Sequence, residues 1–158
     1  LPRPMKGRPG CDFSFSGLKT AVRKIVDKLP DGPIDPQIQA DIAAGFQLAV
    51  GEVFEDRLGR AISRFREEQP TGRALVVGGG VAANRHQRAV LTRLCEAKGL
   101  QFAAPPSPLC TDNAAMIAWA GLERLKRGLS DGMDFAPRPR WPLDPDAPKA
   151  AYAGGKKA

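Results

Sequence analysis

The order of apolar runs and glycines between residues 74 and 104 constrains the fold of this chain most. A short apolar run at 74–77 enters three consecutive glycines. An amphipathic helical pattern over 84–98 follows, and a second short apolar run covers 100–104. A strand, a helix and a strand in this order predict a right-handed βαβ unit whose two strands are parallel.

The three glycines, Gly78, Gly79 and Gly80, form a candidate ligand turn, called here the glycine turn. They carry no Cβ, so a ligand can approach the backbone closely. We expect the helix after them, with Asn84 in its first turn, to direct free N–H groups and its positive dipole end toward the turn. Nucleotide sites in α/β proteins often use this arrangement, but it also occurs as a tight connection without a ligand. The residues of the turn alone leave both alternatives open.

Before this unit, the pattern predicts a short strand and two helices. Residues 13–16 alternate apolar and small polar side chains, which is typical of a strand. A helical pattern starts at Leu18 and ends at the turn 30–33, and we expect Ser16 to cap it rather than to bind a phosphate. Asp-Pro at 35–36 then begins a long amphipathic helix that lasts until residue 70.

After the second strand, a polar turn precedes the last predicted helix. Thr111 or Asp112 is expected to cap this helix, which ends at Gly128. A carboxylate there can accept backbone N–H bonds or leave an oxygen free for a metal ion, and Asn113 has the same two interpretations. If the strands are parallel, Asp112 and the glycine turn both lie at carboxyl ends of strands, the edge where open α/β sheets bind ligands.

Composition indicates a globular chain with less ordered ends. Of the 158 residues, 42% are hydrophobic, which is enough for one domain with a core. We expect a loop or frayed end at 1–10, an extended strap at 134–144 and a disordered tail at 145–158. No apolar run approaches the roughly 20 residues that span a bilayer. The start at Leu1, without an initiator methionine, suggests a fragment or a processed chain.

Charge and cysteine content narrow the classes of function. The 24 Lys and Arg against 17 Asp and Glu give a net charge of +7, which favours a polyanion such as RNA or else a solvated basic surface. Cys11, Cys95 and Cys110 form no CxxC pair and are typical of reduced thiols in a cytoplasmic protein. The single histidine, His86, supports neither Cys–His catalysis nor a histidine-rich metal site.

Four motifs in series resemble one known family. They are FSFSGLKT at 13–20, GGVAANR at 79–85, CTDNAAMIA at 110–118 and RPRWPL at 138–143. Over roughly residues 11–144 they resemble the carboxyl-terminal half of the TsaD family in its bacterial form. Members of this family are tRNA N6-adenosine threonylcarbamoyltransferases, formerly called glycoproteases or O-sialoglycoprotein endopeptidases.

The resemblance implies a fold and a reaction. The fold is α/β, with residues 11–144 as the helix-rich second lobe of an actin/Hsp70-like (ASKHA) two-lobed fold. The reaction moves a threonylcarbamoyl group from threonylcarbamoyl-AMP to N6 of adenosine 37 in tRNAs that read ANN codons. Asn84 matches the family's nucleotide-binding asparagine, with the glycine turn beside the adenosine, and Asp112 matches a carboxylate ligand of an active-site Fe(2+) or Zn(2+). The implied partners are tRNA, a TsaB-like paralogue and a TsaE-like ATPase in the cytoplasm.

The chain also departs from the family pattern. The family's other two metal ligands are a histidine pair, H-x-x-x-H, in the amino-terminal half, whereas this chain has only His86 in a different context. One carboxylate does not hold a transition metal tightly, since three protein ligands are the usual minimum. We therefore expect the chain to need the missing amino-terminal lobe, to be inactive alone, and to bind metal and nucleotide poorly.

Two other functions stay open from the sequence. A metalloprotease would need a metal-activated water and a general base, as in H-E-x-x-H helices, and this chain has no such motif. A non-enzymatic assembly or scaffold lobe is the other alternative. The sequence identifies no catalytic proton-transfer group for any of these functions.

Overall fold

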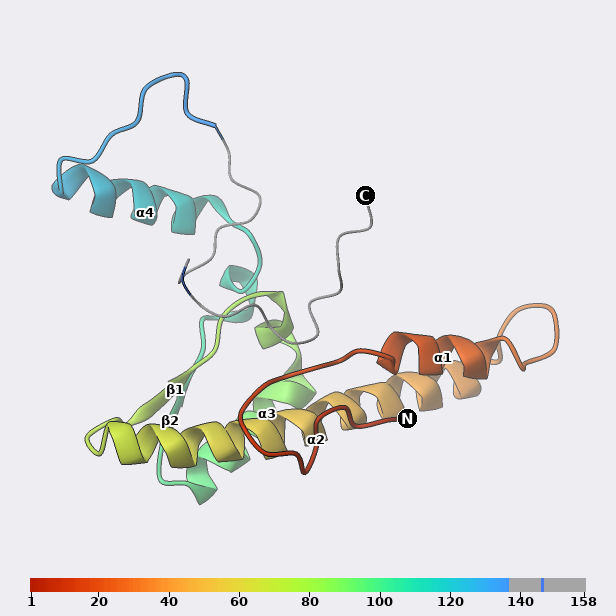
Figure 1. Ribbon diagram of the computed structural model, residues 1–158. Helices are drawn as coiled ribbons and strands as arrows, with labels where there is room; N and C mark the ends of the chain where they lie inside the picture. Colours follow the sequence, from red (N-terminus) through yellow and green to blue (C-terminus); the bar gives the residue numbers. More distant parts are fainter. Residues whose placement is uncertain (137–145, 147–158) are drawn as a thin grey trace. The chain divides into compact units, whose positions relative to one another are not determined.

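The computed structural model describes residues 1–136 and residue 146 (Figure 1). Two compact units divide the chain, the first Leu1–Ile117 and the second from Ala118 onward. The strap expected at 134–144, the tail expected at 145–158 and the RPRWPL motif therefore lie mostly or wholly outside the described residues. The helices and strands, in chain order, are α1 (Leu18–Val26), α2 (Pro36–Glu68), β1 (Ala74–Val76), the 3₁₀ helix η1 (Gly80–Ala83), α3 (Arg85–Ala97), β2 (Gln101–Ala103), the 3₁₀ helix η2 (Ser107–Leu109) and α4 (Ala114–Lys126).

The predicted order of strand, helix and strand and the parallel pairing of the two strands are confirmed. β1 and β2 pair in parallel, with Leu75 opposite Phe102, and α3 connects the two strands and packs on β2 and α2. The apolar side chains predicted to face inward from α3, Val90, Leu91 and Leu94, are all buried. A core of Ile62, Leu94, Cys95 and Leu100, with Leu58, Leu75 and Phe102 packed against it, fills the space between α2, α3 and the sheet.

The long helix α2 begins and ends as predicted. The Asp35 side chain caps it by accepting hydrogen bonds from the N–H groups of Gln37 and Ile38, and the helix ends shortly before Pro70. α1 contacts the amino-terminal half of α2 (Figure 1). α3 approaches α2 closely at Gly51, because a Cβ built there would lie 3.2 Å from the Cγ2 atom of Val90.

Two expectations before α1 are wrong. Residues 13–16 form no strand; instead the rings of Phe13 and Phe15 contact the Phe54 ring of α2 edge-on, at 5.8 and 5.6 Å between centroids. Both side chains thus find apolar partners without any backbone pairing. Ser16 does not cap α1, because the cap position is Gly17, whose φ of +80° suits glycine and not serine.

The first ten residues, expected as a loop or frayed end, form turns that are hydrogen-bonded to α2. The fully buried Arg57 donates to the carbonyl oxygens of Met5 (2.6 Å) and Arg8 (2.7 Å), and also to those of Pro9 and Gly10. An arginine can serve several carbonyls at once because its planar guanidinium carries five N–H donors. This segment therefore leads the chain along α2 toward Phe13.

Candidate functional site

The glycine turn lies exposed at the carboxyl end of β1. Gly79 has φ +86° and ψ 171°, a conformation that only glycine adopts without strain. A Cβ built on any of the three glycines would meet no other atom within 4 Å. Within the described part of the chain, the N–H groups of Gly79 and Gly80 donate to no acceptor. The turn thus offers free backbone donors to open space, as a ligand site requires.

The helix after the turn starts where we expected it, with Asn84 as its cap residue, but a further element precedes it. The four residues Gly80–Ala83 form the 3₁₀ helix η1, and α3 begins only at Arg85. The first N–H groups of α3 therefore do not follow the glycines directly. That the positive end of the α3 dipole faces the turn stays a prediction, now with the 3₁₀ helix η1 between the two.

Asn84 has a structural role that accounts for both of its polar atoms. Its Oδ1 accepts a hydrogen bond from the N–H of Gln87 at 3.1 Å, which caps α3. Its Nδ2 donates to Oε1 of Gln47 in α2 at 3.0 Å, and the Gln87 amide in turn donates to the Gln47 carbonyl at 2.9 Å. These bonds fix the start of α3 on α2, so a ligand would meet a side chain that is already held in place.

Asp112 is exposed, and neither it nor Thr111 caps α4. Instead Oδ1 of Asn113 accepts from the N–H of Met116 at 3.0 Å, and its Nδ2 donates to the Thr111 carbonyl at 2.9 Å. The expected cap is therefore wrong by one or two positions, since the helix begins only at Ala114. Among residues 1–136 and 146, no group donates a hydrogen bond to the Asp112 carboxylate.

The structure brings the two polar turns to the same edge of the sheet, as predicted for parallel strands. η1, which follows the glycine turn, contacts η2, which precedes Asp112. Arg88 joins them: its Nε donates to the Ala82 carbonyl, and its Nη2 donates to the Pro105 carbonyl at 2.5 Å and to Sγ of Cys110 at 3.2 Å. Sequence reasoning missed Arg88, although its place one helical turn after Asn84 puts both on one face of α3.

The described residues do not form a metal site by themselves. No group of three or more His, Cys, Asp or Glu side chains that could hold an ion occurs among them. The Asp112 carboxylate accepts no hydrogen bond from the described residues. The single histidine of the chain, His86, lies on α3 and forms no such group with it. A metal ion would therefore need ligands from elsewhere.

A small cavity lies beneath the glycine turn. It has a volume of about 290 Å³, and its lining includes Phe13, Phe54, Phe102, Gly78 and Gln87. The lining is mostly apolar, so it extends the core to the carboxyl edge of the sheet. Its lining residues come from α2, α3, the two strands, η1 and the segment before α1.

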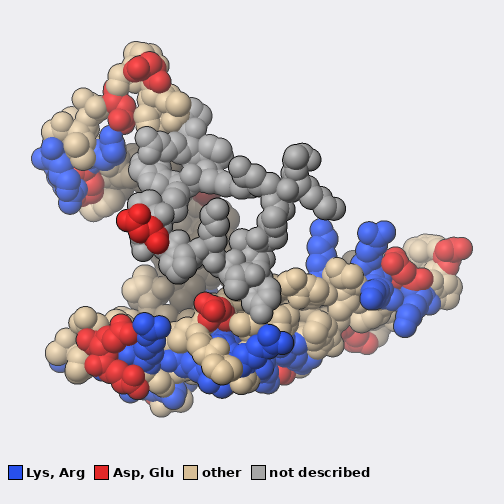
Figure 2. All heavy atoms as spheres, viewed as in Figure 1, with Lys and Arg blue, Asp and Glu red and all other residues tan. Residues whose placement is uncertain are grey.

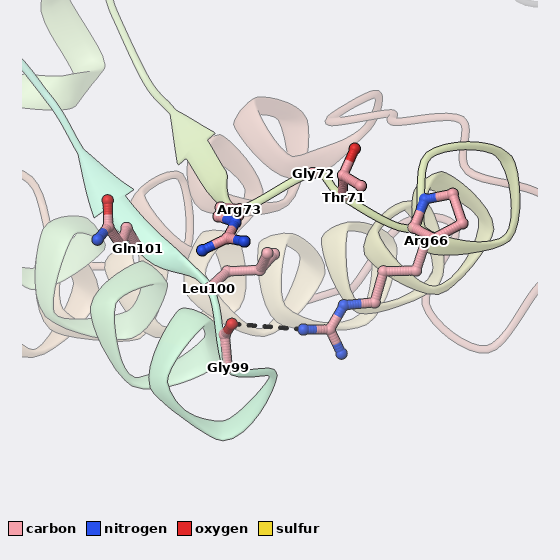
Figure 3. A pocket seen from close by; sticks show the side chains of 8 residues that line it. Arg66, Thr71, Gly72, Arg73, Gly99, Leu100 and Gln101 are labelled. Carbon is pink, nitrogen blue, oxygen red and sulfur yellow. Dashed lines mark hydrogen bonds between the residues drawn. The ribbon is translucent and has the colours of Figure 1, made fainter.

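A larger pocket, of about 850 Å³, opens at the opposite, amino-terminal end of the strands (Figure 3). Arg66, Thr71, Arg73 and Gln101 contribute to its lining. The Arg66 guanidinium donates to the carbonyls of Lys98 and Gly99. These carbonyls follow the end of α3, where no further helical turn supplies a backbone N–H. Arg66 thus closes a helix end, and none of the predicted site residues lines this pocket.

Basic and acidic side chains are mixed along α1 and α2. On the face shown in Figure 2, Lys and Arg lie next to Asp and Glu along this part of the molecule. Ion pairs such as Arg64–Glu68 at 2.8 Å and Lys6–Glu52 at 2.7 Å account for some of the mixture. On that face, the described basic side chains of α1 and α2 are therefore interleaved with acidic ones and do not form a purely basic patch.

Parallel strands joined by a helix, with an exposed glycine turn at their carboxyl edge, define an α/β protein with a candidate ligand site at that edge. Comparison with known proteins identifies the family within this class. The family model for TsaD, tRNA N6-adenosine threonylcarbamoyltransferase, matches residues 1–119. The chain belongs to this family, so the predicted family membership is confirmed.

Curated relatives agree with the family model. A tRNA N6-adenosine threonylcarbamoyltransferase of Rhodospirillum rubrum is 61% identical over 158 residues, which is 100% of this chain and 44% of the relative. One of Paramagnetospirillum magneticum is 58% identical over 97% of this chain and 44% of the relative. The chain therefore spans less than half the length of the relatives it matches. In the described residues, no helix is long and apolar enough to cross a membrane.

Proposed function

We propose that this chain forms the carboxyl-terminal part of a tRNA N6-adenosine threonylcarbamoyltransferase. In this proposal the complete enzyme moves the threonylcarbamoyl group from threonylcarbamoyl-AMP to N6 of adenosine 37 in tRNAs that read ANN codons. The observation that carries the proposal is the glycine turn, with free N–H groups at the carboxyl edge of a parallel sheet, in a chain of this family. The small sheet and the surrounding helices are compatible with one lobe of the family's ASKHA fold.

The backbone of the glycine turn binds the adenylate in this proposal. The free N–H groups of Gly79 and Gly80 donate to its oxygens, and the absence of side chains at 78–80 lets the ligand approach closely. Asn84 lies beside the ligand and keeps the turn in place through its bonds to α2 and α3. We assign no proton-transfer residue.

We further propose that Asp112 supplies one ligand to an Fe(2+) or Zn(2+) ion of the complete enzyme. Because the described residues do not fit a metal on their own, the remaining ligands come from the amino-terminal lobe, and we assign no reaction step to the ion. A TsaB-like and a TsaE-like protein are the proposed partners, and the cytoplasm, where tRNA is modified, is the proposed location.

A reconstitution assay tests the proposed reaction. The chain is assayed for threonylcarbamoyl transfer to tRNA alone and together with the part of the Rhodospirillum rubrum relative that the chain does not match. We expect transfer only in the combination, and no transfer in the combination would contradict the proposal. Asp112→Ala in the combination should abolish transfer, whereas unchanged transfer would show that Asp112 is not a ligand. Asp131→Ala, which changes an exposed carboxylate paired with Arg124, is the control.

Backbone amide spectroscopy tests the proposed nucleotide position in the chain itself. AMP is added at high concentration, because we expect weak binding without the other lobe. Chemical-shift changes should centre on residues 78–84. Changes centred on Arg66, Arg73 and Gln101 would instead place the nucleotide in the larger pocket at the other end of the strands.

A further inference from the structure

We propose that Arg88 is a positioning residue that holds the glycine turn and the loop 105–113, called here the Asp112 loop, in one fixed register. Its guanidinium donates to the Ala82 carbonyl of η1 on one side. On the other side it donates to the Pro105 carbonyl at 2.5 Å and to Sγ of Cys110 at 3.2 Å. One side chain of α3 therefore connects the segments that follow both parallel strands.

An arginine suits this task for a geometric reason. Its Nε and Nη atoms are several donors in one rigid plane, so they serve acceptors that belong to different segments. A lysine at this position has a single side-chain nitrogen, so it would hold either η1 or the Asp112 loop more readily than both at once. Without a donor at position 88, the carbonyls of the buried Ala82 and the half-buried Pro105 would lose a partner, which favours local opening of the loops.

The contact between Arg88 and Cys110 also restrains the loop segment that contains Asp112. Cys110 is only 4% exposed, and its thiol lies between the Arg88 guanidinium and the carbonyls of Pro105 and Pro106, at 3.5 and 3.6 Å. Asp112 follows two positions later and has no hydrogen bond of its own within the described ranges. The anchored Cys110 thus restrains the loop on the near side of Asp112, while Asn113 holds the other side through its bonds to Thr111 and Met116.

The accessibility of Cys110 tests the mechanical part of the proposal in the full chain. Wild type, Arg88→Gln, Arg88→Lys and the control Arg93→Gln, which changes an exposed arginine of the same helix, are labelled with a thiol reagent and mapped by mass spectrometry. Arg88→Gln should raise the Cys110 labelling rate about tenfold or more, because the loop opens locally. Arg88→Lys should raise it less, and Arg93→Gln should leave it unchanged.

Cys95, which lies in the core, is the internal reference for global unfolding. An unchanged Cys110 rate in Arg88→Gln would overturn the proposal. A parallel rise at Cys95 and Cys110 would overturn it as well, because Arg88 would then support the whole fold and not the register of two loops.

The consequence for catalysis rests on the proposed function and has its own measurement. In the reconstituted enzyme, Arg88→Gln should lower kcat for transfer about tenfold or more with little change in KM, because it misplaces groups without removing a contact to substrate. Unchanged kcat together with faster Cys110 labelling would show that the register does not matter for transfer. If the wild-type combination itself transfers nothing, the proposed function fails, while the labelling result still decides the role of Arg88 in the fold.

Discussion

At the scale of single residues, Arg57 organises the first ten positions of the chain. It is a fully buried cation in the middle of α2, and several backbone carbonyls of the 5–10 segment are its acceptors. Buried charges are costly unless they are paired or hydrogen-bonded, so this arrangement ties the segment and the side chain to each other. We expect neither the 5–10 segment nor the buried Arg57 guanidinium to keep this conformation without the other.

Replacing Arg57 should therefore cost much more than replacing a neighbour of the same type. We expect Arg57→Ala to lower the free energy of unfolding by about 3 kcal/mol, because it removes a fully buried side chain and leaves several part-buried carbonyls without their donor. Arg60→Ala, which removes an exposed partner of Asp56 at 3.6 Å, should cost less than about 1 kcal/mol. Urea denaturation measures both, and equal losses would show that the buried hydrogen bonds contribute little.

Glu52 gives the same segment a dependence on pH. Hydrogen bonds from Arg3 and Lys6 lower the pKa of Glu52 from its ordinary value of 4.5 to about 2. A carboxyl group whose pKa is lowered by folding stabilises the folded state above its ordinary pKa and loses this contribution as pH falls toward the lowered value. Between pH 4.5 and pH 2, protonation should therefore weaken the attachment of Arg3 and Lys6.

The variant Glu52→Gln tests this dependence. At neutral pH it should be less stable than wild type by about 0.5–1 kcal/mol, as is usual for partly exposed ion pairs. The difference should shrink toward zero as the pH approaches 2. Thermal unfolding at a series of pH values measures it, and a gap that stays constant over that range would exclude the proposed titration.

At the scale of elements, the contact between α2 and α3 depends on one glycine. A Cβ at Gly51 would lie 3.2 Å from Cγ2 of Val90 and 3.4 Å from Oε1 of Gln87. At Gly59, also in α2, the nearest atom would be Cδ1 of Leu94 at 4.0 Å, an ordinary contact distance. The same substitution should therefore have opposite effects at these two positions.

We expect Gly59→Ala to stabilise the chain by about 0.5–1 kcal/mol, the usual gain in helix propensity. Gly51→Ala should lack this gain and destabilise the chain by about 1 kcal/mol or more, because Val90 is a stiff, buried neighbour that must shift. Chemical denaturation of the two variants side by side gives the comparison. A gain at Gly51 equal to that at Gly59 would mean that α2 and α3 separate easily.

At the scale of the whole molecule, charge should govern non-specific contact with RNA. The net charge of +7 attracts polyanions, but the interleaving of both signs along α1 and α2 offers few adjacent cations to a phosphate backbone (Figure 2). We expect tRNA binding by this chain to be weak and to fall further when salt rises from about 50 to about 200 mM. Filter binding at several salt concentrations measures this, and salt-independent binding would point to base contacts instead.

Much of the local structure could be predicted because short-range chemistry controls it. Asp-Pro at 35–36 specified the start of α2 through a cap and a fixed φ, and apolar spacing specified its length. The strand, glycine and helix order specified the parallel pairing of β1 and β2. Local signals failed where two neighbours compete for one role, as at Ser16 against Gly17 and at Asp112 against Asn113.

The candidate site shows the limit of such reasoning. The glycine turn and Asp112 could be placed on one edge because parallel strands share their carboxyl ends. The bridge through Arg88 could not, since it joins residues 17 and 22 positions away along the chain. The partner of the Asn84 amide, Gln47, is 37 positions away and equally invisible in a local pattern.

By itself, the sequence determined the α-helices and the two paired strands of the described residues, their order, the parallel pairing and the family, because caps, spacings and motifs act over a few residues. Only the tertiary structure decided that Arg57 buries itself under the 5–10 segment, that Phe13 and Phe15 pack on Phe54 instead of forming a strand, and that Arg88 links the two turns. Most of these contacts join residues that are far apart in the chain, such as Arg57 with Met5 and Arg88 with Cys110. The spacing of apolar and polar residues does not predict these contacts, because they depend on which surfaces folding brings within hydrogen-bond or van der Waals distance.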